Sequence, residues 1–217
     1  MTTSTSPTVL RVDPERPGLP GLLQVACLAG AGLGVLDLVL QLSLPYPWAN
    51  LANSSAVWAL AAFALAYWAR TTLGNAALAG TVMLVVAVEV YYVAAIVLDR
   101  AGPASLVAPT TLMWLLFGVL AGSVFGIAGT WARQERPWRA ATGLAAAAAV
   151  LFSEAIVRLL PGSGSAMGDL GTTLLTLGLG VAVLLAAATR PAHLARTLIV
   201  VPALVVLGTA ALAVAGW

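Results

Sequence analysis

The amino-acid sequence predicts an all-α membrane protein with seven transmembrane helices. Apolar residues make up 61% of the 217-residue chain and charged residues only 8%, whereas roughly a quarter of the residues in a soluble domain are charged. A soluble fold of this length has too little interior to bury so many apolar side chains. A transmembrane helix needs about 20 mostly apolar residues, and seven such stretches with short loops account for nearly the whole chain.

The predicted spans follow one another without room for a separate soluble domain. They cover residues 18–44, 51–68, 76–98, 105–130, 138–160, 167–188 and 193–216. We expect a flexible cytoplasmic arm over the polar residues 1–17 and a single transmembrane domain over residues 18–217. The two prolines of PYPW (45–48) end the first span, and no repeat or interrupted helix is visible. Gly118, Gly122 and Gly126, at spacing four, indicate close packing against another helix.

The arginine residues predict the orientation of the chain, because loops rich in Arg and Lys stay in the cytoplasm. All ten cations are arginine. Eight lie in segments that share one side of the predicted membrane: Arg11, Arg16, Arg70, Arg133, Arg136, Arg139, Arg190 and Arg196. The opposite loops contain only Arg100. The N-terminus is therefore expected in the cytoplasm and the C-terminus outside.

Several kinds of chemistry have no support in the sequence. A net charge of +2 is too small to indicate a nucleic-acid partner. The chain has one cysteine, Cys27, and one histidine, His193, whereas a zinc site takes several such ligands. It also lacks a glycine-rich phosphate loop and a nucleophilic serine motif. We therefore expect no metal site and no cofactor.

Three acidic residues lie well inside predicted spans, away from the first turn, where each costs about 2.5 to 3.5 kcal/mol to insert. They are Asp37, Glu89 and Glu154. At about 1.5 Å per residue, Asp37 and Glu154 lie roughly 9 Å below the outer surface and Glu89 roughly 13 Å below it. Ionisable residues within a membrane generally mark functional sites. Three carboxyl groups at similar depth in the outer half therefore predict a site there, with these residues as its catalytic groups.

Aromatic and amide side chains accompany the carboxyl groups. Tyr92 shares a helical face with Glu89, and two tryptophans lie at similar outer depth in the second and fourth spans. Together they predict an outward-lying cavity lined by carboxyl groups, aromatic rings and amides. The predicted substrate-binding residues are Trp58, Tyr92, Trp114, Asn50, Asn53 and Arg158.

Each carboxyl group also has a structural interpretation. Glu154 and Arg158 are four residues apart on one helix, so they can neutralise each other. Asp37 lies close enough to the interface to be hydrated, or to bond with Gln41. Glu89 has no cation within a turn, which favours either a neutral acid that donates a proton or the partner of a cation on another helix.

Four segments carry a resemblance to a known family: LPYPWANLANSSAVW (44–58), EVYY (89–92), VFGIAGTWAR (124–133) and FSEAIVRLL (152–160). They resemble a domain-of-unknown-function family of actinobacterial multi-span membrane proteins, over about residues 20–160. This resemblance implies a multi-span fold in a bacterial inner membrane but no activity. In size, helix number and intramembrane carboxyl groups, the chain is also similar to small seven-helix membrane terpene cyclases, although no motif matches theirs.

The predicted function is that of an integral membrane enzyme that cyclises a lipophilic polyprenyl chain. Glu89, as a neutral acid in a dry pocket, would protonate the alkene. The aromatic rings would stabilise the resulting cation, and Asp37 or Glu154 would accept the final proton. One alternative is a small-solute transporter or a substrate-binding membrane subunit, with Glu89 as a proton-coupling site. A structural partner subunit without chemistry is the third.

Overall fold

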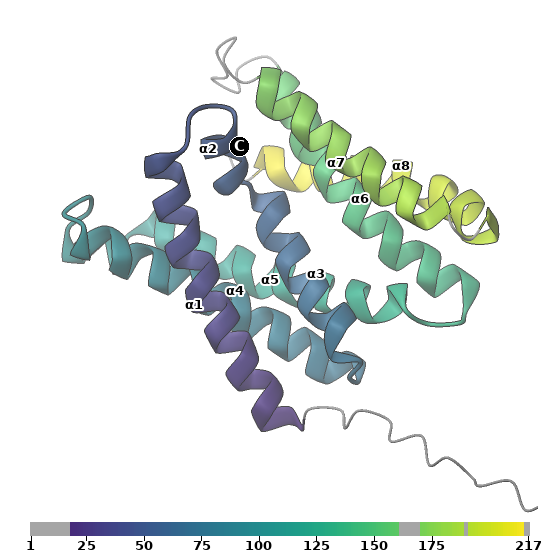
Figure 1. Cartoon of the computed structure of the whole chain (residues 1–217), viewed down its shortest axis with the longest axis horizontal. Helices are drawn as coiled ribbons and strands as arrows, with labels where there is room; N and C mark the ends of the chain where they lie inside the picture. Colours follow the sequence, from purple (N-terminus) through teal and green to yellow (C-terminus); the bar gives the residue numbers. More distant parts are fainter. Residues whose placement is uncertain (1–17, 161–169, 189–190, 215–217) are drawn as a thin grey trace, which may run out of the picture.

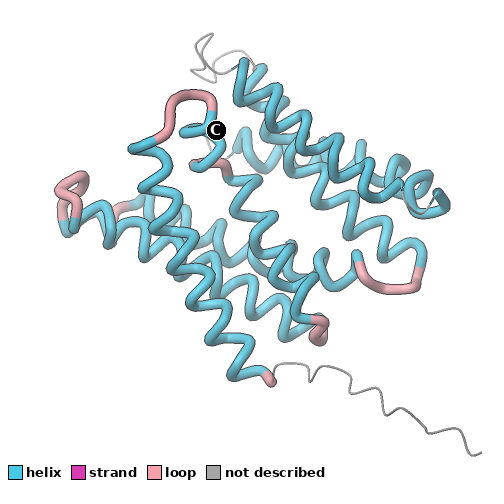
Figure 2. The backbone as a smooth tube through the Cα atoms, viewed as in Figure 1, coloured by secondary structure: helices cyan, strands magenta, loops and turns pink. Residues whose placement is uncertain are grey.

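The computed structural model describes residues 18–160, 170–188 and 191–214, and within these ranges the regular structure is entirely helical (Figures 1 and 2). The elements are α1 (Leu19–Ser43), α2 (Trp48–Ala52), α3 (Ser55–Ala69), α4 (Leu73–Val97), the 3₁₀ helix η1 (Pro103–Val107), α5 (Pro109–Ala132), α6 (Pro137–Leu159), α7 (Leu170–Ala188) and α8 (Pro191–Val214). The predicted arm over residues 1–17 and the predicted start of the sixth span lie outside the described residues.

Six of the described helices are long and apolar enough to cross a bilayer, namely α1, α4, α5, α6, α7 and α8. Helix α3 is also apolar but has only 15 residues. At about 1.5 Å per residue it extends roughly 22 Å, against about 30 Å for the hydrocarbon core. The chain is therefore an all-helical, multi-pass protein of the lipid bilayer, as its composition predicts.

The second predicted span is interrupted near its start. Asn53 and Ser54 separate the short helix α2 from α3, so the expectation of one unbroken helix over residues 51–68 is wrong at this point. Ser54 is the N-cap of α3, where its hydroxyl accepts a hydrogen bond from the Val57 amide at 3.3 Å. Helix α3 thus begins anew beside the end of α1, after a loop and a single turn of helix.

The helices form two packed groups. In the first, α4 lies between α1 and α5, and in the second, α6 packs against α7 and α8. Helices α3 and α5 also contact α6, which joins the groups. In Figure 1 the α3–α4 and α5–α6 connections lie toward the lower right, and the α1–α2 and α4–α5 connections lie toward the upper left. Successive long helices therefore run in alternating directions.

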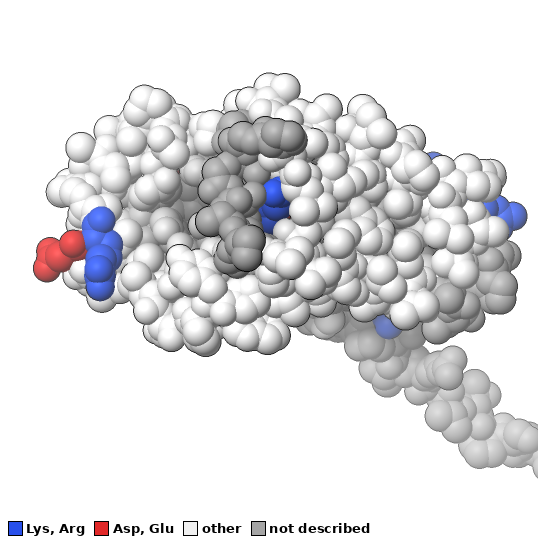
Figure 3. All heavy atoms as spheres, turned by 90° about the horizontal axis from the view of Figure 1, so that it is seen from above, with Lys and Arg blue, Asp and Glu red and all other residues white. Residues whose placement is uncertain are grey.

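The surface between these two ends suits contact with lipid chains. Figure 3 shows a face that is mostly uncharged, with charged groups at its two ends and a blue group near its middle. Large apolar side chains are exposed on several helices, among them Leu28, Leu120, Leu185 and Leu207. In water such a surface would be an aggregation hazard, whereas in a bilayer it is the ordinary outer surface of the protein.

Glycine residues bring the helices of the first group close together. A Cβ atom on Gly30 or Gly34 of α1 would collide with backbone carbonyl oxygens of α4. Gly80 of α4 and Gly122 of α5 face each other in the same way, and Gly126 meets the α4 backbone one turn further along. Such small residues permit backbones to approach closely inside membranes. The predicted packing role of the α5 glycines is therefore confirmed.

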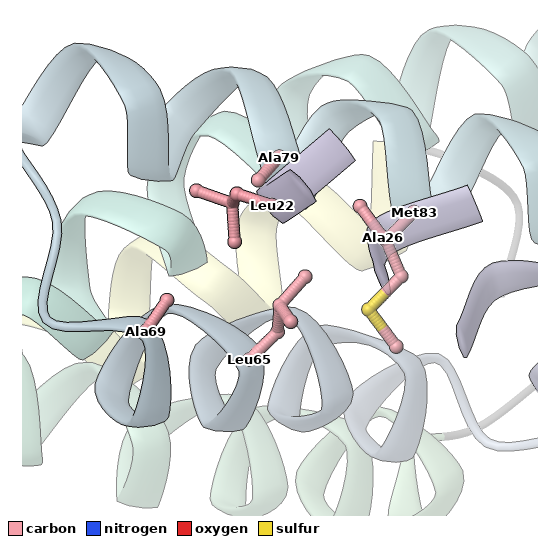
Figure 4. Packing of buried hydrophobic residues seen from close by; sticks show 6 residues of the cluster. All are labelled: Leu22, Ala26, Leu65, Ala69, Ala79 and Met83. Atoms are coloured by element: carbon pink, nitrogen blue, oxygen red, sulfur yellow. The ribbon is translucent and has the colours of Figure 1, made fainter. Parts of the chain in front are cut away.

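Two apolar clusters complete the interior. The first joins α1, α3 and α4 and is shown in Figure 4: Leu22, Ala26, Leu65, Ala69, Ala79 and Met83. The second joins α6 and α8 through Ala145, Ala148 and Val201. Helix α6 is the most buried of the six candidate spans. Because it is enclosed by protein, α6 can carry charged groups that a lipid-facing helix could not.

The glycine contacts predict that an alanine substitution lowers the stability at Gly122 but not at Gly178. Gly122→Ala places a methyl group against the α4 backbone, and we expect a loss of stability of about 1 to 3 kcal/mol from overpacking. Gly178→Ala on α7 is the control, because the space beside it is open and alanine has the better helix propensity. The midpoint of thermal unfolding in detergent would report both. Equal midpoints for the two variants would contradict the proposed packing.

Candidate functional site: a carboxyl and aromatic cavity

Glu154 of α6 holds the start of α3. Its side chain is fully buried, and its Oε2 accepts three hydrogen bonds, from the hydroxyls of Ser54 (2.8 Å) and Ser55 (3.0 Å) and from the backbone N–H of Ala56 (2.8 Å). Its other oxygen, Oε1, forms an ion pair with Nη2 of Arg158 at 2.9 Å. The ion pair that the spacing predicts is therefore present, and the same carboxylate also binds another helix. We call this set of contacts the Glu154 clamp.

The Glu154 clamp provides an acceptor for polar groups that the break between α2 and α3 leaves without a partner in the helix. The first N–H groups of a helix have no partner within that helix, and an unpartnered N–H costs several kcal/mol away from water. Glu154 supplies an acceptor for the Ala56 amide, and its negative charge lies at the positive end of the α3 dipole. Asn50 of α2 adds a further anchor by donating to Oγ1 of Thr172 on α7 at 3.2 Å. The segment that leads into α3 is thus fixed to α6 and α7.

A cavity of about 210 Å³ lies between α1, α3, α4 and α5. We call it the Asp37 cavity after its single charged lining residue. The wall includes the start of α3, through Asn53, Ser54 and Ser55. Its aromatic lining residues are Trp58, Tyr91, Tyr92, Trp114 and Phe117.

The cavity lies at the level where the glycines on the facing sides of α4 and α5 are followed by larger side chains. On α5 the close contacts of Gly126 and Gly122 are followed by Gly118 and Trp114, both of which line the cavity. On α4 the contact of Gly80 is followed by cavity-lining residues that end in two tyrosines. Tyr91 and Tyr92 pack edge to face at 5.4 Å between ring centroids. The close backbone contact between α4 and α5 at Gly80 and Gly122 therefore ends before the level of the rings, where the cavity lies.

Asp37 is the polar centre of this cavity. Its side chain is only 3% exposed, and its Oδ2 accepts a hydrogen bond from Nε2 of Gln41, one turn along α1, at 3.0 Å. The indole N–H of Trp58 is a further donor in its vicinity. The second oxygen, Oδ1, is buried and accepts no hydrogen bond of good geometry from any residue in the described part of the chain. A buried oxygen without a donor is costly, so the carboxyl group of Asp37 beside this cavity is suited to a ligand that donates.

The structure brings together only part of the predicted site. Five of the predicted residues line the cavity: Asp37, Asn53, Trp58, Tyr92 and Trp114. Glu154 and Arg158 lie behind its wall in the clamp, and Asn50 anchors α2. Glu89 is partly exposed and is not among the lining residues. The three carboxyl groups therefore do not share one cavity, and a proton-donating role for Glu89 stays a prediction.

Sequence reasoning missed other lining residues. Tyr91 lies beside Tyr92 in the same short motif, yet the helical face chosen for Glu89 excludes it. Phe117 is one turn from Trp114, and their rings pack at 6.0 Å between centroids. Ser55 contributes through the break between α2 and α3. Helical spacing from Trp114 would have selected Phe117, whereas Tyr91 joins the cavity through the packing of α4 against α1 and α5, which spacing alone does not give.

The fold and the cavity define a class of protein: a multi-pass membrane protein with a carboxyl group and several aromatic rings enclosed among its helices. A family model matches residues 14–216 and bears the description family of unknown function, DUF6518. The chain belongs to that family, as the resemblance to a domain of unknown function predicts. Comparison with curated proteins and with solved structures gave no match.

Proposed function

We propose that the protein binds a small organic solute in the outer half of the bilayer, as a carrier or as the substrate-binding subunit of a larger membrane assembly. The observation that carries this proposal is the cavity that Asp37 lines together with several aromatic rings, since the carboxyl group of Asp37 has a buried oxygen, Oδ1, without a hydrogen-bond donor among the described residues. Binding pockets commonly combine an apolar wall with a few fixed polar groups. Here the rings form the wall, and Asp37 with Gln41 forms the polar point.

The size of the cavity favours a small solute. Its 210 Å³ are below the roughly 300 to 1,000 Å³ of sites for drug-sized ligands. A whole polyprenyl chain exceeds that space, whereas a small metabolite or a lipid headgroup fits it.

Acid-initiated cyclisation is the second candidate, because aromatic rings around an acid are what that reaction needs. Asp37 would be the proton donor in this case, since it lines the cavity and Glu89 does not. The substrate would enter with one end of its chain and leave the remainder in the lipid. Both candidates place the chemistry at the same residues and differ in the ligand.

The orientation of the cavity follows from the arginines. We propose seven spans, with α3 as a short span preceded by α2, in the inner membrane of a bacterium. Five of the described arginines lie at helix ends or in connections on one side: Arg70, Arg133, Arg136, Arg139 and Arg196. Arg100 lies on the opposite side, in the α4–α5 connection. The positive-inside rule then places the α1–α2 and α4–α5 connections, and the nearby cavity, toward the outside.

A pair of reporter fusions tests this orientation. A reporter that works only in the cytoplasm should be active after Arg136 and inactive after Trp217, because an odd number of spans separates the two termini. Expression of both fusions is verified by immunoblot. Activity at both positions would contradict the seven-span arrangement.

A ligand panel tests the proposed function. Purified protein is heated with millimolar amines, carboxylates, sugars and short alcohols, and with farnesol and farnesyl diphosphate. We expect at least one small-solute class to raise the unfolding midpoint, since a ligand at ten times its Kd stabilises the folded state by about 1.4 kcal/mol.

Filling the cavity provides the control. Ala121→Leu adds three carbon atoms at a lining position and should abolish the stabilisation. Ala64→Leu makes the same change at an exposed position on α3 and should preserve it. Conversion of farnesyl diphosphate to a cyclic product by wild type but not by Ala121→Leu would replace the solute proposal with the cyclase. No difference between the variants with any compound would contradict both.

A further inference from the structure

We infer that the ligand of the Asp37 cavity carries a small alkylammonium group, whose N–H donates to the carboxylate of Asp37 while its carbon atoms contact the surrounding rings. This inference rests on the proposed function and names the ligand class. A free amine and the headgroup of an amine-bearing lipid present the same chemistry. Charge, donor count and the aromatic wall each point to it.

In the proposed complex Asp37 is an ionised carboxylate, and the ammonium group provides its counter-charge. A carboxylate only accepts hydrogen bonds, whereas a protonated carboxyl group must also donate one. Nε2 of Gln41 donates to Oδ2 at 3.0 Å, and the indole N–H of Trp58 lies in the vicinity. Among the described residues no arginine lines the cavity, and the sequence contains no lysine. A carboxylate enclosed in this way lacks a counter-charge from the lining residues, and a buried charge needs one.

The wall of the cavity favours an organic cation. Four rings that bear electron-rich faces, those of Trp58, Tyr91, Tyr92 and Trp114, line one small space. Rings of this type attract ammonium groups that lie within about 6 Å of their centroids. A sugar or a carboxylate anion would gain nothing comparable, and an anion would be repelled by Asp37.

An inorganic cation is a poorer match. Hard cations need several oxygen ligands, preferably carboxylates, and Asp37 is the charged residue among the described residues that line the cavity. In the described part of the chain no group of three or more potential metal-ligating side chains occurs. One carboxylate beside aromatic rings suits an N–H donor better than it suits a coordination shell.

Isothermal titration calorimetry tests the inference on the full chain in nanodiscs of phosphatidylglycerol, a lipid without an amine. The probes are n-butylammonium and its uncharged counterpart n-butanol. We expect heat of binding with butylammonium and none with butanol. Asp37→Asn should weaken the affinity for butylammonium by at least about tenfold, because a hydrogen bond to a charged group is lost. Asp99→Asn, at an exposed position between α4 and α5, should bind as wild type does.

A second variant covers the case in which Asp37→Asn does not fold. Trp58→Phe removes the indole N–H and the larger ring, and should weaken butylammonium binding, whereas Trp68→Phe at an exposed position on the same helix should not.

Adding phosphatidylethanolamine to the discs distinguishes a lipid headgroup from a free amine as the source of the ammonium group. Competition with butylammonium identifies a lipid headgroup, and unchanged binding identifies a free amine. Either result supports the ammonium class.

The ligand class and the proposed function fail in different ways. Equal binding of butanol and butylammonium, or unchanged affinity in Asp37→Asn, would overturn the ammonium inference. If another class in the thermal panel still stabilised wild type but not Ala121→Leu, the solute-binding function would stand. If no class did so, both would be overturned.

Discussion

The structure depends on one carboxylate that serves two helices. Glu154 lies on the enclosed helix α6 and accepts three hydrogen bonds from the start of α3, while Arg158 balances its charge. Without such an acceptor, a helix that begins afresh inside a membrane would leave its first N–H groups unpartnered. The clamp therefore permits the interruption between α2 and α3. That interruption in turn places Asn53 to Ser55 in the wall of the cavity.

The cavity has a second requirement, which is the uneven distribution of small and large residues. Glycines fix the spacing of α1, α4 and α5 along one half of their length. Tyr91, Tyr92 and Trp114 lie in the other half and line the cavity, where Gly118 of α5 makes only an ordinary contact with α4. Helix α3 contributes the remaining wall. The form of the cavity is a consequence of helix packing, and its chemistry is a consequence of Asp37.

The sequence predicted the elements that depend on local pattern. Composition indicated the membrane fold, spacing indicated the Glu154–Arg158 pair, and insertion cost selected Asp37. It did not predict the break before α3. Asn53 and Ser54 interrupt the helix here because a distant acceptor, Glu154, binds the first polar groups of the new helix. That acceptor is about a hundred residues away in the chain, since Ser54 and Glu154 are 100 apart. Depth alone also grouped Glu89 with Asp37, whereas rotation about the α4 axis leaves Glu89 outside the cavity lining.

Hydrogen exchange at the start of α3 tests the clamp. In wild type the amide of Ala56 is bonded to Glu154 at 2.8 Å and should exchange slowly. In Glu154→Ala that amide should exchange at least about tenfold faster, because a hydrogen bond to a charged group is lost. Glu89→Ala is the matched control and should leave the rate at Ala56 unchanged. An equally slow Ala56 amide in Glu154→Ala would contradict the account, because the start of α3 would then be held by something other than Glu154.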